Sequence, residues 1–304
     1  TTTATWLAHL LKPAVLGGNI PETGFLRVLP KISKYSGPLV LELSSFQLEF
    51  MAKGMKPPRV AVITNLFNDH LNRYGTQEAY ANFKANIFSN QRAGDFLILN
   101  ADDPWHPLFL RKKPQSKVYY VSLKRLGSQV SGLFFIEDRI FFKEGRSVKS
   151  VGEIKGLSPH FKLNLLSALL AARVAGRTFE ELFHRVMTLP VISFRQEIIL
   201  NRKDIVVIND TTATRPDATI TALERFSPEK DRLFLITGGT DKKLEFGNLA
   251  KKIKENVSPQ RLFLIQGSAT QVLVKELDKL KYFRQTKPQL FDNLKSIILG
   301  IKLS

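Results

Sequence analysis

The side chains with the clearest capacity for chemistry lie within residues 59–88 and shortly before that segment. Asp69 and His70 follow a short apolar run. Glu42 ends an earlier apolar run, and Lys84 lies further along the chain, on a segment with helical spacing. Carboxylate and imidazole groups of this kind suit Mg²⁺ or Mn²⁺ beside a phosphate better than a structural Zn²⁺. The bland alternative is a core strand, a solvated loop and a lysine that reaches out to water.

An open α/β sheet would bring these groups to one place. Residues 60–63 and 38–43 are short apolar runs typical of strands that are buried on both faces. A helix follows the first of them, with Thr76 as its N-cap and Lys84 on its inward face. In such a sheet the carboxyl ends of parallel strands share an edge, where sites are built. Glu42 inside a buried strand would be costly unless it is paired or bound to a cation.

The start of the chain offers a second candidate element. Residues 1–11 have the spacing of an amphipathic helix that begins on three threonines. Gly17, Gly18 and Asn19 then allow a backbone to approach a ligand closely. The same three residues are also common in a tight turn with no ligand.

The remaining pattern alternates strands with helices and restarts after a boundary near 188–190. We predict an α/β fold with two domains: a central domain with a doubly wound sheet over 1–190, and a Rossmann-like domain over 191–304. The further strands predicted are 94–105, 117–122, a hairpin over 133–142, 204–210, 232–239 and 261–268. The further helices predicted are 161–176, 180–187, 218–226, 247–256, 270–281 and 290–300.

The composition indicates a globular protein that prefers anionic partners. The net charge is +18, whereas hydrophobic content of 43% and charged content of 24% are ordinary. There is no Cys, which excludes disulfides and thiolate chemistry and fits a reducing cytoplasm. No apolar run is long enough to span a membrane. The basic residues are spread along the chain without a basic, aromatic-interleaved motif, so nucleic acid and phosphorylated small molecules both remain possible partners.

Several stretches, taken together, resemble the Mur ligase family. The matching stretches are LELSSFQLE (41–49), TNLFNDHLNRYGTQEAYANFKANIF (64–88), NADD (100–103), VINDTTAT (207–214) and GGTDKK (238–243). The first of them, LELSSFQLE, most resembles the branch of the family that adds D-glutamate to UDP-N-acetylmuramoyl-L-alanine. The matches occur in order over nearly the whole chain.

The resemblance implies an ATP-dependent ligase of peptidoglycan precursor synthesis. ATP phosphorylates the terminal carboxylate of the substrate, and the amine of D-glutamate then attacks the acyl phosphate. Such phosphoryl transfer depends on metal ions and positioning more than on covalent chemistry by the protein. Two Mg²⁺ sites are expected, with a cytoplasmic, monomeric enzyme and no nucleic-acid or membrane partner.

The resemblance also implies the ligands of these metals. Glu42 matches a glutamate that holds the Mg²⁺ shared with ATP, and His70 belongs with a second Mg²⁺. Lys84 matches a lysine that is carbamylated in the family. An ammonium group, with a pKa of ~10.4, would be repelled by Mg²⁺, whereas a carbamate presents anionic oxygens. Thr1 is the candidate for the last hydroxyl of the family's P-loop.

Substrate contacts are implied in the first domain. Asn19 and Gln47 match positions that contact the nucleotide-sugar substrate. Ser44 matches a serine that lines the site, and Asp69 lies beside the metal-binding histidine.

Further contacts are implied around ATP and the incoming amino acid. Arg195 and Asp210 match positions that meet ATP, and Asn164 matches an asparagine on the adenine side. Thr214 and Lys242 match positions near D-glutamate, whose carboxylates call for cations and hydroxyls. Each of these positions, taken singly, also fits solvated loop material.

The sequence departs from the family pattern at several points. Phe161 stands where an asparagine is common, which puts the adenine contacts in doubt, and Thr212 and Arg215 replace residues that are often Lys and Asn. The family's P-loop and UDP-binding domain would precede Thr1, and a D-glutamate-binding segment would follow the last residue. We therefore expect this chain by itself to be inactive or nearly so.

Three rival interpretations remain. One is a ligase for another acceptor, such as a folylpolyglutamate ligase. Another is a non-catalytic, basic nucleic-acid-binding protein, which would bind with a steep salt dependence. The third is a family member that keeps the fold only for interaction.

Overall fold

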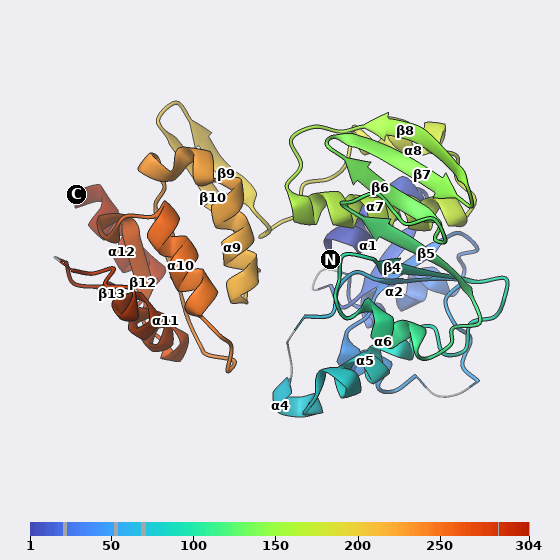
Figure 1. The fold of residues 1–304 in the computed structure, drawn as a ribbon, viewed down its shortest axis with the longest axis horizontal. Coiled ribbons are helices and arrows are strands. Elements are labelled where there is room, and N and C mark those ends of the chain that lie inside the picture. The colour runs from blue at the N-terminus through green and yellow to red at the C-terminus, as the bar shows by residue number, and fades with distance from the viewer. Residues whose placement is uncertain (21–22, 52–53, 68–70, 285, 304) are drawn as a thin grey trace. The chain divides into compact units, whose positions relative to one another are not determined.

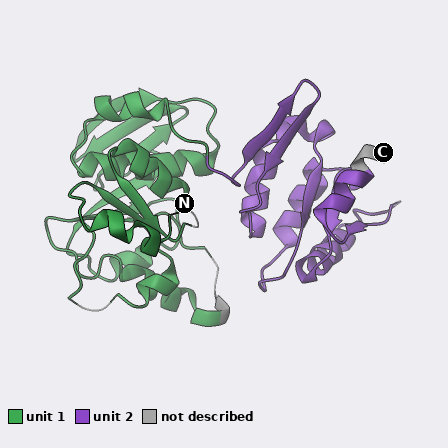
Figure 2. Cartoon of the chain, turned by 180° about the vertical axis from the view of Figure 1, so that it is seen from behind, with its two compact units in different colours: residues 1–191 green, residues 192–304 purple. Residues whose placement is uncertain are grey.

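The chain folds into two compact units, Thr1–Val191 and Ile192–Ser304 (Figure 2). The structure is a computed structural model that describes residues 1–304 apart from 21–22, 52–53, 68–70, 285 and 304, and apart from the side chains of 71–72 and 301–303. Both units combine helices with mainly parallel sheets. The predicted α/β class is thus confirmed.

A six-stranded sheet forms the centre of the first unit (Figure 1). Its spatial order follows the chain: β3 (Val60–Ile63), β4 (Phe96–Asn100), β5 (Lys117–Ser122), β6 (Gly132–Ile136), β7 (Arg139–Glu144) and β8 (Ser147–Glu153). The first four strands are parallel, and the last two add antiparallel pairs. The carboxyl ends of the first strands therefore share one edge.

Helices cover both faces of this sheet because successive strand side chains point to opposite sides. On one face Leu97 and Leu99 pack with Tyr80 and Phe109, which come from α5 (Gln77–Ala85) and α6 (His106–Leu110). On the other face lies α7 (Pro159–Val174), which contacts β3, β4, β5 and β6. This helix ends as predicted, with Gly176 in the left-handed region at φ 112°.

A small parallel pair of strands accompanies the main sheet. β1 (Val15–Gly18) pairs with β2 (Leu39–Glu42), and both contact α1 (Thr2–Leu10). α1 also packs on α7 and on α8 (Phe179–Val186). Short helices complete the unit: α2 (Phe25–Ile32), α3 (Ser45–Leu48) and α4 (Leu71–Tyr74).

The second unit has its own core. Strands β11 (Leu235–Gly238), β12 (Leu262–Ile265) and β13 (Gln289–Phe291) form a parallel sheet in that order. Leucines of β12 pack with α9 (Pro216–Arg225), α10 (Gly247–Asn256) and α11 (Ser268–Lys279). An antiparallel hairpin, β9 (Glu197–Arg202) and β10 (Ile205–Asn209), precedes them, and α12 (Leu294–Leu303) follows.

The sequence missed four strands and placed the last helix too early. β1, β8, β9 and β13 were not predicted, and the last described helix begins at Leu294 rather than near residue 290. β8 is mostly exposed and polar, so it lacks the apolar pattern of a buried strand. None of the helices in the described part of the chain combines the length and apolar character that crossing a membrane requires.

Candidate active site

Three of the predicted site residues meet at the carboxyl end of β2. The register pairs Gly18 with Glu42, and the backbone N–H of Asn19 donates to the Glu42 carbonyl at 2.8 Å. The Asn19 amide nitrogen lies 3.5 Å from Glu42 Oε1, and the main-chain nitrogen of Thr1 lies 2.7 Å from Oε2. These contacts place Thr1 and Asn19 beside the two oxygens of the Glu42 carboxylate.

Gly18 makes this pairing possible. Its φ is 107°, and a Cβ at this position would lie 2.1 Å from the Glu42 carbonyl oxygen. The two glycines were predicted to let the backbone approach a ligand closely. In the structure, Gly18 instead lets β1 approach the neighbouring strand β2 closely. Its effect is to bring Asn19 beside Glu42.

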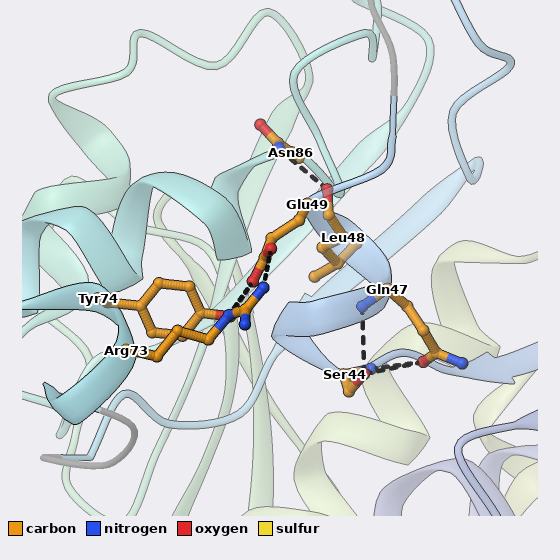
Figure 3. Close-up of polar contacts among 7 residues, drawn as sticks. All are labelled: Ser44, Gln47, Leu48, Glu49, Arg73, Tyr74 and Asn86. Atoms are coloured by element: carbon orange, nitrogen blue, oxygen red, sulfur yellow. Dashed lines mark hydrogen bonds and ion pairs between the residues drawn. The ribbon is translucent and has the colours of Figure 1, made fainter.

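Ser44 and Gln47 form the N-terminal cap of α3. Ser44 Oγ accepts the backbone N–H of Gln47 at 3.3 Å, and Gln47 Oε1 accepts the backbone N–H of Ser44 at 2.8 Å. This reciprocal arrangement is a capping box, and it fixes both side chains at the end of β2. The amide nitrogen of Gln47 points away from Ser44 (Figure 3).

Lys84 is half-buried on α5, and its ammonium nitrogen lies 4.9 Å from the centre of the Tyr80 ring. α5 begins as predicted, with Thr76 Oγ1 accepting the backbone N–H of Ala79 at 3.1 Å. α5 also contacts α3, since the side chain of Asn86, just past its end, donates to the carbonyl of Leu48 at 2.9 Å (Figure 3). Lys84 therefore belongs to the helix that packs against α3, which follows Glu42 in the chain.

Asp69 and His70 lie outside the described residues, so the predicted meeting of His70 with Glu42 and Lys84 stays a prediction. The chain leading to them is fixed as far as Phe67. Gln77 donates its side-chain amide to the carbonyls of Leu66 and Phe67, at 3.3 and 3.1 Å.

Two carboxylates at the end of β4 bind the neighbouring strand ends. Asp103 is buried and accepts the backbone N–H of Leu66 at 2.6 Å and that of Trp105 at 3.0 Å. Burial raises the pKa of Asp103, and the two N–H donors oppose that rise. Asp102 accepts the hydroxyl of Ser122 at 2.7 Å. The NADD motif thus positions the strand ends.

Asn164 joins α7 to α1. The hydroxyl of Thr3 donates to Asn164 Oδ1 at 2.9 Å. Phe161, which departs from the family pattern, packs against Trp6 with ring centres 5.6 Å apart. The aromatic substitution therefore extends the contact between α1 and α7.

In the second unit, Asp210 and Arg195 belong to one loop cluster. Asp210 Oδ1 accepts the backbone N–H of Gln196 at 3.1 Å, and Gln196 Oε1 accepts Arg225 Nη1 at 2.8 Å. Burial raises the pKa of Asp210, while the Gln196 hydrogen bond and the charges of Arg195 and Arg225 lower it.

The backbone on either side of Arg195 is left-handed. Phe194 has φ 63° and Gln196 has φ 47°, both unusual for residues with side chains. Thr212 Oγ1 donates to the Phe194 carbonyl at 2.6 Å, and Glu197 Oε2 accepts the Phe194 N–H at 2.8 Å. Thr212, which differs from the family pattern, therefore stabilises the strained backbone on the N-terminal side of Arg195.

Thr214 and Lys242 are exposed on loops of this unit. The backbone N–H of Thr214 donates to the Thr212 carbonyl at 2.9 Å. Beside Lys242, the Asp241 N–H donates to Ser268 Oγ at 2.9 Å, which ties two strand-end loops together.

Sequence reasoning missed a polar cluster formed by Glu49, Arg73 and Tyr74 (Figure 3). Glu49 accepts hydrogen bonds from both other side chains. Glu49 lies in the segment 41–49, and Arg73 and Tyr74 lie in the segment 64–88, both of which resemble the family. The opposite charges of Glu49 and Arg73 were the sequence feature that could have indicated their pairing.

The described residues include no group of three or more His, Cys, Asp or Glu side chains that could hold a metal ion. The Glu42 carboxylate at the end of β2 does fit a hard cation in type, because such cations prefer oxygen ligands.

A known family model covers most of the first unit. Residues 1–172 match the Mur ligase middle domain. The chain belongs to the Mur ligase family.

Curated relatives share one name. The chain is 33% identical over 289 residues to the UDP-N-acetylmuramoylalanine–D-glutamate ligase of Roseiflexus sp. (strain RS-1), covering 91% of this chain and 60% of the relative. It is 34% identical over 266 residues to the ligase of the same name from Pelotomaculum thermopropionicum, covering 84% of this chain and 55% of that relative. The chain thus spans somewhat more than half the length of these relatives.

Solved structures agree on the fold. MurF from Acinetobacter baumannii matches with a TM-score of 0.69 at 14% identity, covering 100% of this chain and 68% of that one. MurF ligase from Thermotoga maritima in complex with ADP matches with a TM-score of 0.68 at 19% identity, covering 99% and 70%.

Proposed function

We propose that this chain is part of an ATP-dependent ligase that adds D-glutamate to UDP-N-acetylmuramoyl-L-alanine. The observation that carries the proposal is the placement of Asn19 against Glu42 at the carboxyl end of β2. The shared name of the curated relatives supports D-glutamate as the incoming amino acid. A cytoplasmic setting, where ATP is available, belongs to the same proposal.

The reaction has two steps. A carboxylate oxygen of the substrate attacks the γ-phosphorus of ATP, and ADP leaves. The amine of D-glutamate then attacks the acyl carbon, phosphate leaves, and the nitrogen loses a proton to give the amide. Mg²⁺ supplies charge neutralisation on the phosphates when it is bound. Glu42 and Thr1 would hold one such ion, and His70 with a carbamylated Lys84 would hold the second.

Residues at the strand ends would orient the substrate. Asn19 is already placed against Glu42, and Ser44 and Gln47 are fixed by the α3 cap. Asp69 joins this group in the proposal. Their role is to hold the reacting carboxylate in line with the γ-phosphate.

Polar groups elsewhere would serve ATP and the amino acid. Arg195, presented between two left-handed residues, and Asp210 would meet the nucleotide, with Asn164 near the base. Thr214 and Lys242 are exposed and would offer a hydroxyl and a cation to the carboxylates of D-glutamate.

A phosphate-release assay on the complete natural protein that carries this chain tests the proposal. Turnover should require ATP, Mg²⁺, UDP-N-acetylmuramoyl-L-alanine and D-glutamate together. Glu42→Gln should lower kcat/KM by more than about a hundredfold, because loss of an outer partner of a metal ligand already costs about that much. Glu153→Gln, in an exposed ion pair of β8, should leave turnover unchanged.

The acceptor distinguishes this activity from its rivals. Turnover with a folate acceptor in place of the nucleotide-sugar would transfer the assignment to a folylpolyglutamate ligase. Salt-sensitive binding to DNA or RNA without turnover would favour the basic nucleic-acid-binding alternative.

The 304-residue chain alone is proposed to have little or no activity, because it spans somewhat more than half the length of the relatives. Strong turnover by this chain in the same assay would contradict that part. Carbamylation of Lys84 is testable separately, by ¹³C NMR of the protein in ¹³C-labelled bicarbonate. A carbamate signal should be present in the parent protein and absent from Lys84→Ala.

A further inference from the structure

The carboxylate of Glu49 takes hydrogen bonds from two neighbouring side chains of α4. Arg73 donates through Nε to Oε1 at 3.0 Å and through Nη2 to Oε2 at 2.7 Å, which is a two-pronged pair (Figure 3). The Tyr74 hydroxyl donates to Oε1 at 2.5 Å. Such a fork fixes the relative orientation of the partners as well as their separation.

This cluster is more than a loose surface ion pair. The Glu49 side chain is only 14% exposed, although that of Arg73 is 50% exposed. The guanidinium of Arg73 also lies 5.0 Å from the centre of the Phe46 ring. The hydrogen bond from Arg73, with that from Tyr74, lowers the pKa of Glu49 below its ordinary value. Glu49 is therefore ionised at neutral pH and keeps all its acceptors.

Tyr74 connects the Glu49 carboxylate to the Tyr80 ring, over which the Lys84 ammonium lies. The rings of Tyr74 and Tyr80 are stacked, with centres 5.2 Å apart and planes at 18°. The Lys84 ammonium lies on the Tyr80 ring at 4.9 Å. Burial and the bond to Glu49 raise the pKa of Tyr74, so its hydroxyl keeps the proton that it donates.

We propose that Glu49 is a positioning residue of the ligase site, acting through Arg73 and Tyr74. It anchors α4, which begins at the residue after His70, and it fixes the aromatic pair beneath Lys84. The inference rests on the proposed function for the roles of His70 and Lys84. Glu49 itself is assigned no contact with the substrate.

The first test measures Lys84 without using activity. The complete natural protein and its Glu49→Gln and Tyr74→Phe variants are treated in bicarbonate-free buffer, where Lys84 is a free amine, with a limiting amount of an acetylating ester. Each lysine is then quantified by peptide mass spectrometry. Lys117, exposed at the start of β5, is the internal reference. Loosening the ring under Lys84 should raise its labelling relative to Lys117 by about two- to fivefold.

The second test measures turnover. Both variants should lower kcat by about tenfold to a hundredfold, since small displacements of positioned groups cost this much. The KM for ATP should stay within about twofold, because the hydrogen bonds that these variants remove do not bind ATP. Arg73→Lys, which keeps the charge but loses the fork, should behave like Glu49→Gln. The matched control is Glu153→Gln, which removes a carboxylate from an exposed pair with Arg139.

The two tests separate this inference from the proposed function. If the parent protein shows no ligase turnover, the proposed function fails, and the labelling ratio still decides the role of Glu49. An unchanged Lys84 ratio in both Glu49→Gln and Tyr74→Phe would overturn the inference. So would an equal rise in Glu153→Gln, because that result would report general loosening of the unit. Tyr74→Phe removes a single hydroxyl, which keeps the test valid if Glu49→Gln fails to fold.

Discussion

Gly18 is the residue whose replacement should most directly disturb the Glu42 cluster. Its φ of 107° is unfavourable for alanine, and the new Cβ would lie 2.1 Å from the Glu42 carbonyl oxygen. Gly18→Ala should therefore lower the free energy of unfolding by ~1–3 kcal/mol from backbone strain alone. Urea denaturation followed by circular dichroism measures this. Gly94→Ala is the matched control, because a Cβ there meets nothing within 4 Å; equal losses in both variants would contradict the prediction.

At this scale the sequence predicted individual groups better than their partners. It indicated that Glu42 must be paired or bound to a cation and that Thr76 caps α5. The structure contains the cap, and the cation at Glu42 stays a prediction. The sequence did not predict that Glu49 binds Arg73 and Tyr74, 24 and 25 positions away. Spacing within one helix or strand predicts which residues share a face, whereas pairing between elements depends on how they pack.

Among the elements, the junction between β3 and β4 depends on Asp103. Its two oxygens accept two different backbone donors, from Leu66 and from Trp105. Asp103→Asn would place an amide N–H₂ against one of these donors, and the loss should be about 1–3 kcal/mol of unfolding free energy. Chemical denaturation of the two proteins measures it.

The control for this substitution is Asp95→Asn. The side chain of Asp95 accepts the backbone N–H of Arg92 at 2.8 Å, and an amide oxygen can take over that bond. Asp95→Asn should therefore lower the free energy of unfolding much less than Asp103→Asn does. If the two variants lose equal stability, the pair of backbone bonds to Asp103 does not fix the junction.

Buried elements were predictable because burial imposes a pattern. β5 was predicted over 117–122 and lies at Lys117–Ser122, and α10 was predicted over 247–256 and lies at Gly247–Asn256. β8 was missed because Ser147–Glu153 is held by strand pairing and not by apolar burial. Backbone pairing of an exposed strand leaves little trace in residue type.

For the whole molecule, the division into two units was predicted near 188–190 and lies after Val191. The restart of strand and helix alternation was a sufficient signal, because each α/β layer needs its own apolar core. Local pattern does not relate Glu42 to Asp210, since the two residues belong to different units. Proximity between such residues depends on domain arrangement, which local pattern does not encode.

Two separate cores predict two separate unfolding events. Leu99 is 1% exposed in the core of the first unit, and Leu264 is 0% exposed in that of the second. Either leucine replaced by alanine should cost about 2–5 kcal/mol, because the apolar side chain is no longer buried and a cavity remains. In scanning calorimetry of the 304-residue chain, Leu99→Ala should lower one transition and Leu264→Ala the other, so each variant is the control for the other. A single transition that both substitutions lower equally would mean that the units unfold as one cooperative body, and that the two cores are energetically coupled.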